Sequence, residues 1–332
     1  MDIRNRNELK QFALERLAEA GTEKKIAGIF AGVVIGLSVV SAIVNYLLGL
    51  GIEQTGGLSN MGTRSLLSSV QAMLPFVQML VLMCMELGYM AAMLRIARGQ
   101  YASPNTLRLG FDRFWVLLRF TILESALFLG MGFASMYFGV MVFLMTPLSA
   151  GVEELLAPVI SQMSVLDQSY VVPDAVYDQL MTAMIPAFVI MLVIYSIAAI
   201  PLMYRLRMTQ YVLIDKPGLG ALAAMRQSRM MMRGNCRKLF RLDLSMWWYY
   251  AASMAIVVVC YGDVILPMLN VQLPMPREVS FFLFYALYWV GQFAIFYYLR
   301  NRVDVTYALT YDAIRPQEQQ TGGVVLGNIF QM

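Results

Sequence analysis

Six apolar runs, each close to the length of a membrane-crossing helix, constrain this chain more than any other feature. They cover approximately residues 26–48, 66–92, 116–144, 184–204, 245–266 and 279–299. A helix needs roughly 20 mainly apolar residues to cross a bilayer, whereas a transmembrane β-barrel would show ~10-residue alternating segments. Charged residues make up only 14% of the chain, and soluble domains carry about a quarter. We therefore expect an all-α, polytopic membrane protein that folds as a six-helix transmembrane bundle.

The runs divide the chain into three segments. Residues 1–25 are expected to form a cytoplasmic amphipathic helix, because four residues share one helical face, namely Leu9, Phe12, Ala13 and Leu17. Residues 26–314 are expected to form the membrane domain. Residues 315–332, with their glutamines and glycines, are expected to be a flexible tail.

The basic residues predict the orientation of the chain in the membrane. Of the 25 lysines and arginines, 23 lie in the amino-terminal segment, the second and fourth connections and the tail. Basic residues collect on the cytoplasmic side of membrane proteins. Both termini are therefore expected in the cytoplasm.

The fourth connection contains a basic amphipathic stretch, Gly220 to Leu242. On a single helix, Arg226, Arg229, Arg233 and Arg237 would form one stripe. The opposite arc would hold small and apolar residues, namely Ala221, Ala224, Met225, Ser228, Met231 and Met232. Basic amphipathic helices next to membrane spans lie in the headgroup layer. The stripe therefore predicts contact with anionic lipid headgroups, although a role in topology alone explains it as well.

The segments before spans one, three and five are similar to one another. In each, a glycine precedes a few polar or charged residues and then the span, as in LAEAGTEKKIAGI, LRLGFDRFWVLLRF and MMRGNCRKLFRL. This pattern suggests a three-fold pseudo-repeat of surface helix plus helix hairpin. Any cytoplasmic entry into a span would give a similar pattern, so the alternative stays open.

The composition excludes several kinds of catalytic and metal site. The chain has no histidine, so neither a Ser-His nucleophile pair nor a histidine zinc site can form. The three cysteines are widely separated and odd in number, which argues against a disulfide framework. Methionines with Cys84 could bind Cu(I), but methionine is also a common core filler. We expect no cofactor, no metal and no enzymatic activity.

Two carboxylates lie inside apolar runs, Glu86 and Glu124. Intramembrane carboxylates are costly and often mark ion or proton paths. They could line a polar cavity between spans two and three. The alternative is a structural contact with Arg119, Arg95 or a hydroxyl group.

The block MRQSRMMMRGNCRKLFRLDLSMWW resembles the hallmark of a bacterial membrane family, domain of unknown function 975. The matching residues are Ser228, Met232, Arg233, Gly234, Asn235, Leu239, Phe240, Leu242, Leu244 and Ser245. Met246 stands where the family usually has Phe, and ELKQFALERL and YALTYDAI are further similarities. The family is more distantly similar to the membrane domain of some glycerophosphodiester phosphodiesterases. The resemblance implies a six-span fold in a bacterial inner membrane, and it implies no established activity or catalytic residues.

These observations favour a non-catalytic accessory or scaffold subunit of a membrane complex or lipid-handling process. Its expected partners are anionic membrane lipids and a protein of the same complex, and nucleic acid is not expected. The alternative is a small transporter or permease that uses Glu86 and Glu124. The oligomeric state stays open.

Overall fold

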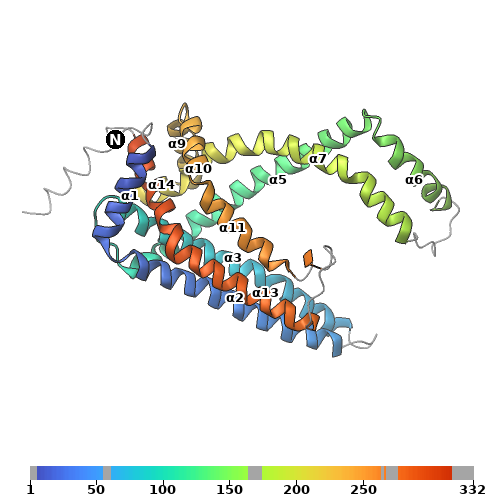
Figure 1. Cartoon of the computed structure of the whole chain (residues 1–332), viewed down its shortest axis with the longest axis horizontal. Coiled ribbons are helices and arrows are strands. Elements are labelled where there is room, and N and C mark those ends of the chain that lie inside the picture. The colour runs from blue at the N-terminus through green and yellow to red at the C-terminus, as the bar shows by residue number, and fades with distance from the viewer. Residues whose placement is uncertain (1–5, 55–60, 164–173, 263–264, 267–275, 316–332) are drawn as a thin grey trace, which may run out of the picture. The chain divides into compact units, whose positions relative to one another are not determined.

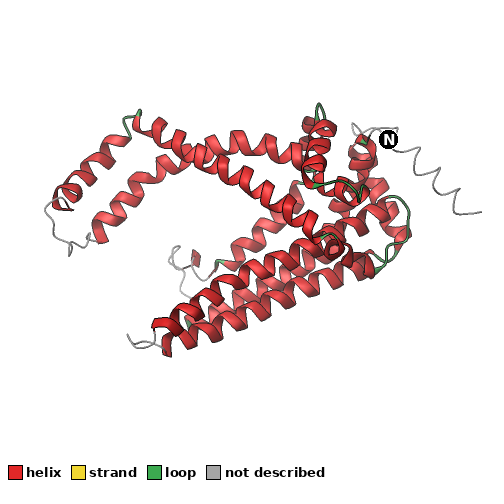
Figure 2. Ribbon diagram, turned by 180° about the vertical axis from the view of Figure 1, so that it is seen from behind, coloured by secondary structure: helices red, strands yellow, loops and turns green. Residues whose placement is uncertain are grey.

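We describe the chain from a computed structural model, which defines residues 6–54, 61–163, 174–262, 265–266 and 276–315. All regular elements within these residues are helices (Figures 1 and 2). The first half contains α1 Arg6–Ala20, α2 Glu23–Gln54, α3 Met61–Ala97, the 3-10 helix η2 Pro104–Arg108, α4 Leu109–Asp112, α5 Phe114–Leu144 and α6 Ser149–Met163. The second half contains α7 Asp174–Leu206, α8 Thr209–Asp215, α9 Ala221–Met232, α10 Cys236–Ser245, α11 Trp247–Cys260, α13 Arg277–Ala294, the π-helix η3 Ile295–Arg300 and α14 Asn301–Ile314. The predicted tail lies outside the described residues except for Arg315.

Five helical stretches are long and apolar enough to cross a membrane. They are Glu23–Ile52, Gly62–Ala97, Phe114–Leu144, Gln179–Asp215 and Phe282–Ile314. A sixth exists if α10 and α11 form one broken span, since these helices are bent by 62° at Met246. The predicted all-α fold with multiple spans is therefore confirmed. The fifth expected span differs from the prediction, because its entry is a bent helix pair.

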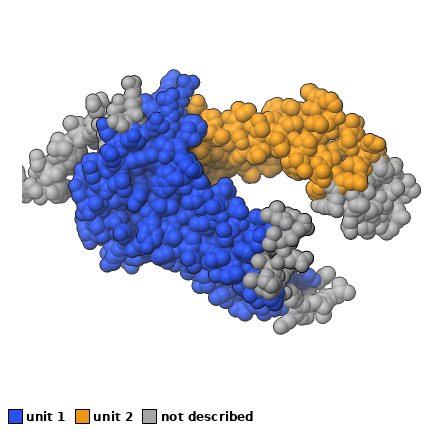
Figure 3. Space-filling view, viewed as in Figure 1, with its two compact units in different colours: residues 1–119, 206–332 blue, residues 120–205 orange. Residues whose placement is uncertain are grey.

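The chain divides into two compact units (Figure 3). Unit 1 contains residues 1–119 and 206–332, and unit 2 contains residues 120–205. In unit 2, Phe143, Val152 and Ala187 form a small apolar core. Surface-helix candidates precede α2, α5 and α11, where the suggested three-fold pattern places them. The three-fold repeat and the single membrane domain of residues 26–314 stay predictions.

Unit 1 has a zone of exposed apolar side chains and a packed zone. In the first zone, α2, α3 and α13 lie side by side (Figure 1). Its large exposed apolar residues include Ile43, Leu47, Leu66, Phe76, Phe282 and Val290. The second zone, here called the head, consists of α1, the end of α3 from Cys84 onward, η2, α4, α8, α9, α10 and α14. Exposed apolar surface suits contact with lipid, whereas buried side chains need packing partners within the protein.

The amphipathic helix at the start of the chain belongs to the head. Of the four residues on the predicted face, Leu9, Ala13 and Leu17 are buried and Phe12 is half-buried, so the face is confirmed. The helix packs against α14 and α3. Gly21 ends it in a left-handed conformation with φ +60°, which a side chain would strain.

Two glycines allow η2 and α4 to pack directly on α3. A Cβ atom on Gly88 of α3 would lie 2.2 Å from the carbonyl oxygen of Leu107. A Cβ on Gly110 of α4 would lie 1.9 Å from the carbonyl oxygen of Cys84. Both neighbours are backbone atoms, so the helices could be this close only without those side chains.

The basic stretch forms two helices, and the prediction of a single helix over residues 220–242 was wrong. Helix α9 ends at Met232 and α10 starts at Cys236. Gly234 lies between them with φ +83°, a left-handed backbone conformation that interrupts an L-residue helix. The six residues of the predicted opposite arc all lie on α9 and are buried within the protein.

Candidate functional site

The most prominent polar feature of the head is a line of side chains along α14. Arg300 precedes the helix, and Asp304, Tyr307 and Tyr311 follow at intervals of three or four residues. This spacing places them on one helical face. Three arginines from the head meet this face in separate clusters.

In the first cluster, Arg300 meets two carboxylates. Its Nη2 pairs with Glu86 of α3, and its Nε donates to Asp304 Oδ2 at 3.0 Å. Three aromatic rings also lie within 5.0 Å of its guanidinium carbon, namely those of Phe30, Tyr89 and Phe296. A buried charge is tolerated when it is paired, and the faces of aromatic rings attract cations. Arg300 therefore ties α2, α3 and α14 together.

The second cluster joins α10 to α14. Arg207 Nη1 and Asp243 Oδ2 are 2.5 Å apart, and Tyr307 donates from its hydroxyl to Asp243 Oδ1 at 2.5 Å. The Arg207 guanidinium also lies 4.3 Å from the centre of the Tyr307 ring. The Tyr250 hydroxyl, 2.8 Å from that of Tyr307, adds α11 to the cluster. Asp243 thus receives hydrogen bonds from a cation and a phenol, as a buried carboxylate requires.

The third cluster fixes the far end of α14. Arg98 bonds Asp215 of α8 at 3.0 Å and Asp312 of α14 at 2.7 Å, while Arg315 reaches Asp215 at 3.1 Å. The Tyr311 hydroxyl donates to Asp215 Oδ2 at 3.1 Å. Burial on its own lowers the pKa of Arg98, but the bonds and charges of Asp312 and Asp215 outweigh it and raise the pKa above its usual value. Arg98 is therefore a permanent cation that connects three helices.

Paired charges of this kind hold helices in register. In each cluster an arginine forms an ion pair with at least one carboxylate. In the second and third clusters a tyrosine hydroxyl also donates a hydrogen bond to a carboxylate oxygen. Within the residues that the structure describes, no group of three or more Cys, Asp or Glu side chains is placed to hold a metal ion. The three clusters therefore connect α3, α8, α10 and α14 through paired charges.

The structure places each of the predicted intramembrane polar residues in a different setting. Glu86 lies where exposed apolar surface gives way to the head, and its partner is Arg300 instead of Arg119 or Arg95. Glu124 lies on the part of α5 in unit 2 and is half-buried. Arg119 is exposed at the end of unit 1. Glu86 and Glu124 are thus described in separate units, and a joint cavity stays a prediction.

The four predicted lipid-contacting arginines are all exposed. Arg226 and Arg229 lie on α9, Arg233 follows its last residue, and Arg237 lies on α10. Large apolar side chains are exposed on the same two helices, namely Leu222, Met230, Phe240 and Leu244. The four arginines lie on two helices and in the break between them, so the predicted stripe along one helix does not form; we call the four residues together the arginine face. Cations among exposed apolar groups suit a headgroup layer, where charge and hydrocarbon meet.

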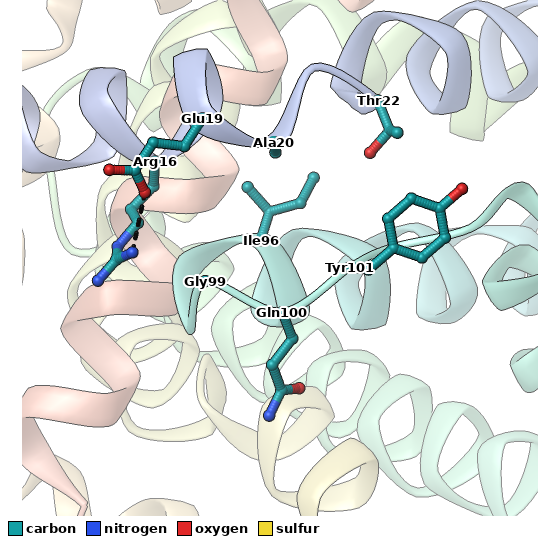
Figure 4. Close-up of a pocket in the computed structure, with 8 residues that line it drawn as sticks. All are labelled: Arg16, Glu19, Ala20, Thr22, Ile96, Gly99, Gln100 and Tyr101. Atoms are coloured by element: carbon teal, nitrogen blue, oxygen red, sulfur yellow. Dashed lines mark hydrogen bonds and ion pairs between the residues drawn. The ribbon is translucent and has the colours of Figure 1, made fainter.

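A pocket of about 220 Å³ lies between the end of α1 and the loop after α3 (Figure 4). Arg16 Nη1 bonds Glu19 at 2.9 Å there, so the two charges balance. Arg16 Nε and the Thr22 hydroxyl are buried and have no hydrogen-bond partner among the described residues. Gly99 has φ +69°, and a Cβ on it would lie 2.8 Å from Arg16 Nη1. The pocket can therefore accept water or a small polar group. Because Arg16 and Glu19 neutralise each other, the pocket favours neither an anion nor a cation.

The fold and the head define an all-α, multi-pass membrane protein. The chain belongs to the family described as Protein of unknown function (DUF975), whose model matches residues 1–318. Comparisons with curated proteins and with solved structures found no match. The family resemblance predicted from the central block is thereby confirmed. Its distant similarity to a phosphodiesterase membrane domain stays a prediction.

The structure gives physical roles to residues of that block. Ser228, Met232, Leu239 and Leu242 are buried in the head, and Gly234 adopts the left-handed conformation of the break between α9 and α10. The Asn235 side chain donates to the Met231 carbonyl at 3.0 Å and so bridges that break. Residues of the block therefore form the break between α9 and α10 and bury one side of each helix in the head.

Sequence reasoning missed the α14 clusters. In the sequence, Arg300 and Arg207 contribute only to the distribution of basic residues, and no motif marks Asp243 or Asp304. One available signal was the recurrence of polar residues at helical spacing from 300 to 312. That signal marks a polar face but gives no partner, because the partners are distant in sequence.

Proposed function

We propose that this protein is a non-catalytic accessory or scaffold subunit of a bacterial inner-membrane complex or lipid-handling process. Both termini lie in the cytoplasm in this proposal, and the arginine face contacts anionic headgroups. The distribution of basic residues supports the orientation. The ion pairs that connect the helices of the head support a scaffold, because binding groups are positioned best on well-packed helices.

One observation carries the proposal, namely that the exposed and buried sides of α9 differ in chemistry. Its buried arc packs into the head, whereas Arg226 and Arg229 point away from that arc and are exposed. Basic residues near an anionic membrane contribute about 1 kcal/mol each. Four such residues would therefore give a preference of about 4 kcal/mol for an anionic surface.

The alternative of a small transporter has less support. A transporter that used Glu86 and Glu124 would need both carboxylates available to a passing ion or proton. Glu86 is already paired with Arg300, which is itself shared with Asp304. This contact favours a structural role for Glu86.

The proposal is tested by purifying the full chain in mild detergent and identifying the lipids and proteins that remain bound. We expect anionic phospholipids to be enriched over their share of the membrane. Replacing Arg226, Arg229, Arg233 and Arg237 by glutamine should remove most of that enrichment, because the replacements take away charge from exposed positions. Arg64→Gln, an exposed arginine on α3, is the control. Equal lipid composition for the wild type and the fourfold variant would contradict the proposal.

A further inference from the structure

A second pocket, of about 110 Å³, lies in the head where α1, α14 and the start of α11 come together. Lys10 and Leu14 line it from α1, and Arg302, Val303 and Thr306 line it from α14. Met246 and Trp248 line it from the bend between α10 and α11. Ligand pockets that enclose a whole small molecule measure roughly 300–1,000 Å³. This pocket can therefore hold only part of a larger ligand.

Positive charge gathers at this pocket without a matching carboxylate. Lys10 uses one proton to donate to the Ser245 carbonyl at 2.8 Å, which leaves two for a ligand. Arg302 is exposed, and the nearby Arg6 donates to the Arg241 carbonyl. In the part of the chain that the structure describes, neither Lys10 nor Arg302 forms an ion pair.

The Lys10 ammonium group is also affected by the positive charge of Arg6. Burial, followed by the charge of Arg6, lowers the pKa of Lys10 below its ordinary value. The three arginine clusters of the head are each compensated, so this group of cations is different. An anion bound beside Lys10 would offset the charge of Arg6.

Apart from Thr306, the remaining residues that line the pocket are apolar, and they lie at the predicted membrane surface. Leu14, Met246 and Trp248 supply hydrocarbon and an indole ring. Trp248 is in the first turn of α11, and tryptophan is enriched where spans enter the headgroup layer. A free anion would gain little from these walls, whereas a lipid would use both the cations and the apolar side.

We propose that this pocket binds one anionic phospholipid, with its phosphate between Lys10 and Arg302 and the start of an acyl chain along Leu14 and Trp248. The site is separate from the arginine face. The arginine face would attract many lipids loosely, whereas the pocket would retain a single molecule. The inference rests on the proposed contact between the head and the membrane, but it uses different residues.

The test is native mass spectrometry of the full chain in mild detergent, titrated with phosphatidylglycerol or with phosphatidylcholine of the same acyl chains. We expect one phosphatidylglycerol to bind with a distinct affinity, and phosphatidylcholine to bind more weakly. Lys10→Gln with Arg302→Gln should weaken that single binding step by about thirtyfold, as expected for two basic residues near a phosphate. Glycerol phosphate without acyl chains should fail to displace the lipid.

Matched variants distinguish lipid binding at the pocket from a general loss of positive charge and from misfolding. Lys24→Gln with Lys25→Gln removes the same charge from exposed positions of α2 and should leave the single step unchanged. Lys10→Arg with Arg302→Lys keeps both charges and should preserve binding, which excludes loss of folding as the cause. Replacing the arginine face should reduce the later, weaker steps only. Equal affinity for the two lipids, or equal losses in both double glutamine variants, would overturn the inference even if the arginine face proves to bind lipid.

Discussion

At the scale of single residues, the head depends on arginines that satisfy several partners at once. Arg98 and Arg300 each bond two carboxylates, and Arg207 bonds one carboxylate while it stacks on a tyrosine. The planar guanidinium presents five donors in fixed directions and also packs on aromatic rings. Lysine has one compact charge and could not reproduce both contacts. The choice of arginine therefore follows from the geometry of the clusters.

Replacing Arg300 by glutamine should destabilise the protein by about 3 kcal/mol, because Glu86 and Asp304 would lose their cation. The measurement is equilibrium unfolding in mixed micelles with increasing denaturing detergent. Arg108→Gln is the control, since Arg108 is exposed on η2, lies outside both proposed lipid contacts and should change stability by less than about 0.5 kcal/mol. Equal stability of the two variants would show that the Arg300 cluster does not hold the head.

At the scale of secondary-structure elements, close backbone contact determines how the helices of the head pack. Helix α3 meets η2 and α4 at Gly88 and Gly110, where backbone atoms occupy the space of a side chain. Small residues permit such approach between helices in membranes, where apolar burial gives little drive for association. The contact keeps the residues after Cys84 inside the head.

Alanine at Gly88 or Gly110 should therefore destabilise the fold by about 1–3 kcal/mol, the usual range for overpacking. Gly32→Ala is a suitable control, because a Cβ on Gly32 of α2 would meet nothing within 4 Å. Alanine there should be neutral or slightly stabilising, since it favours the helix. Detergent unfolding would compare all three variants, and a stable Gly110→Ala protein would contradict the close contact.

Much of the helix pattern could be predicted from the sequence, because local periodicity controls which side of a helix is buried. The buried arcs of α1 and α9 are examples. The break at Gly234 could not be predicted in the same way, since helices tolerate an isolated glycine. The Glu86–Arg300 pair was also inaccessible, because its members are 214 residues apart and no local spacing connects them. Among the candidate sites, the exposure of the arginine face was predictable and the α14 clusters were not.

At the scale of the whole molecule, membrane-facing and packed regions alternate along the chain. The long helices expose large apolar side chains, whereas the head of unit 1 buries its own and exposes arginines. If the bent pair α10–α11 counts as one span, six candidate spans bring both ends of the chain to the same side of the membrane, and the distribution of basic residues predicts that this side is cytoplasmic. The lipid contacts that we propose require that orientation.

The most direct test of the account is the position of the arginine face relative to the membrane. Arg226→Cys would be introduced into a chain whose own Cys84, Cys236 and Cys260 are replaced by alanine, and a membrane-impermeant maleimide would be applied. We expect the maleimide to label Cys at position 226 in inside-out vesicles, and to leave it unlabelled in cells whose outer membrane is permeabilised and whose inner membrane is intact. Arg64→Cys in the same background should show the reverse, because Arg64 is predicted on the opposite side. Labelling of the Arg226 position from outside intact cells would contradict the central claim.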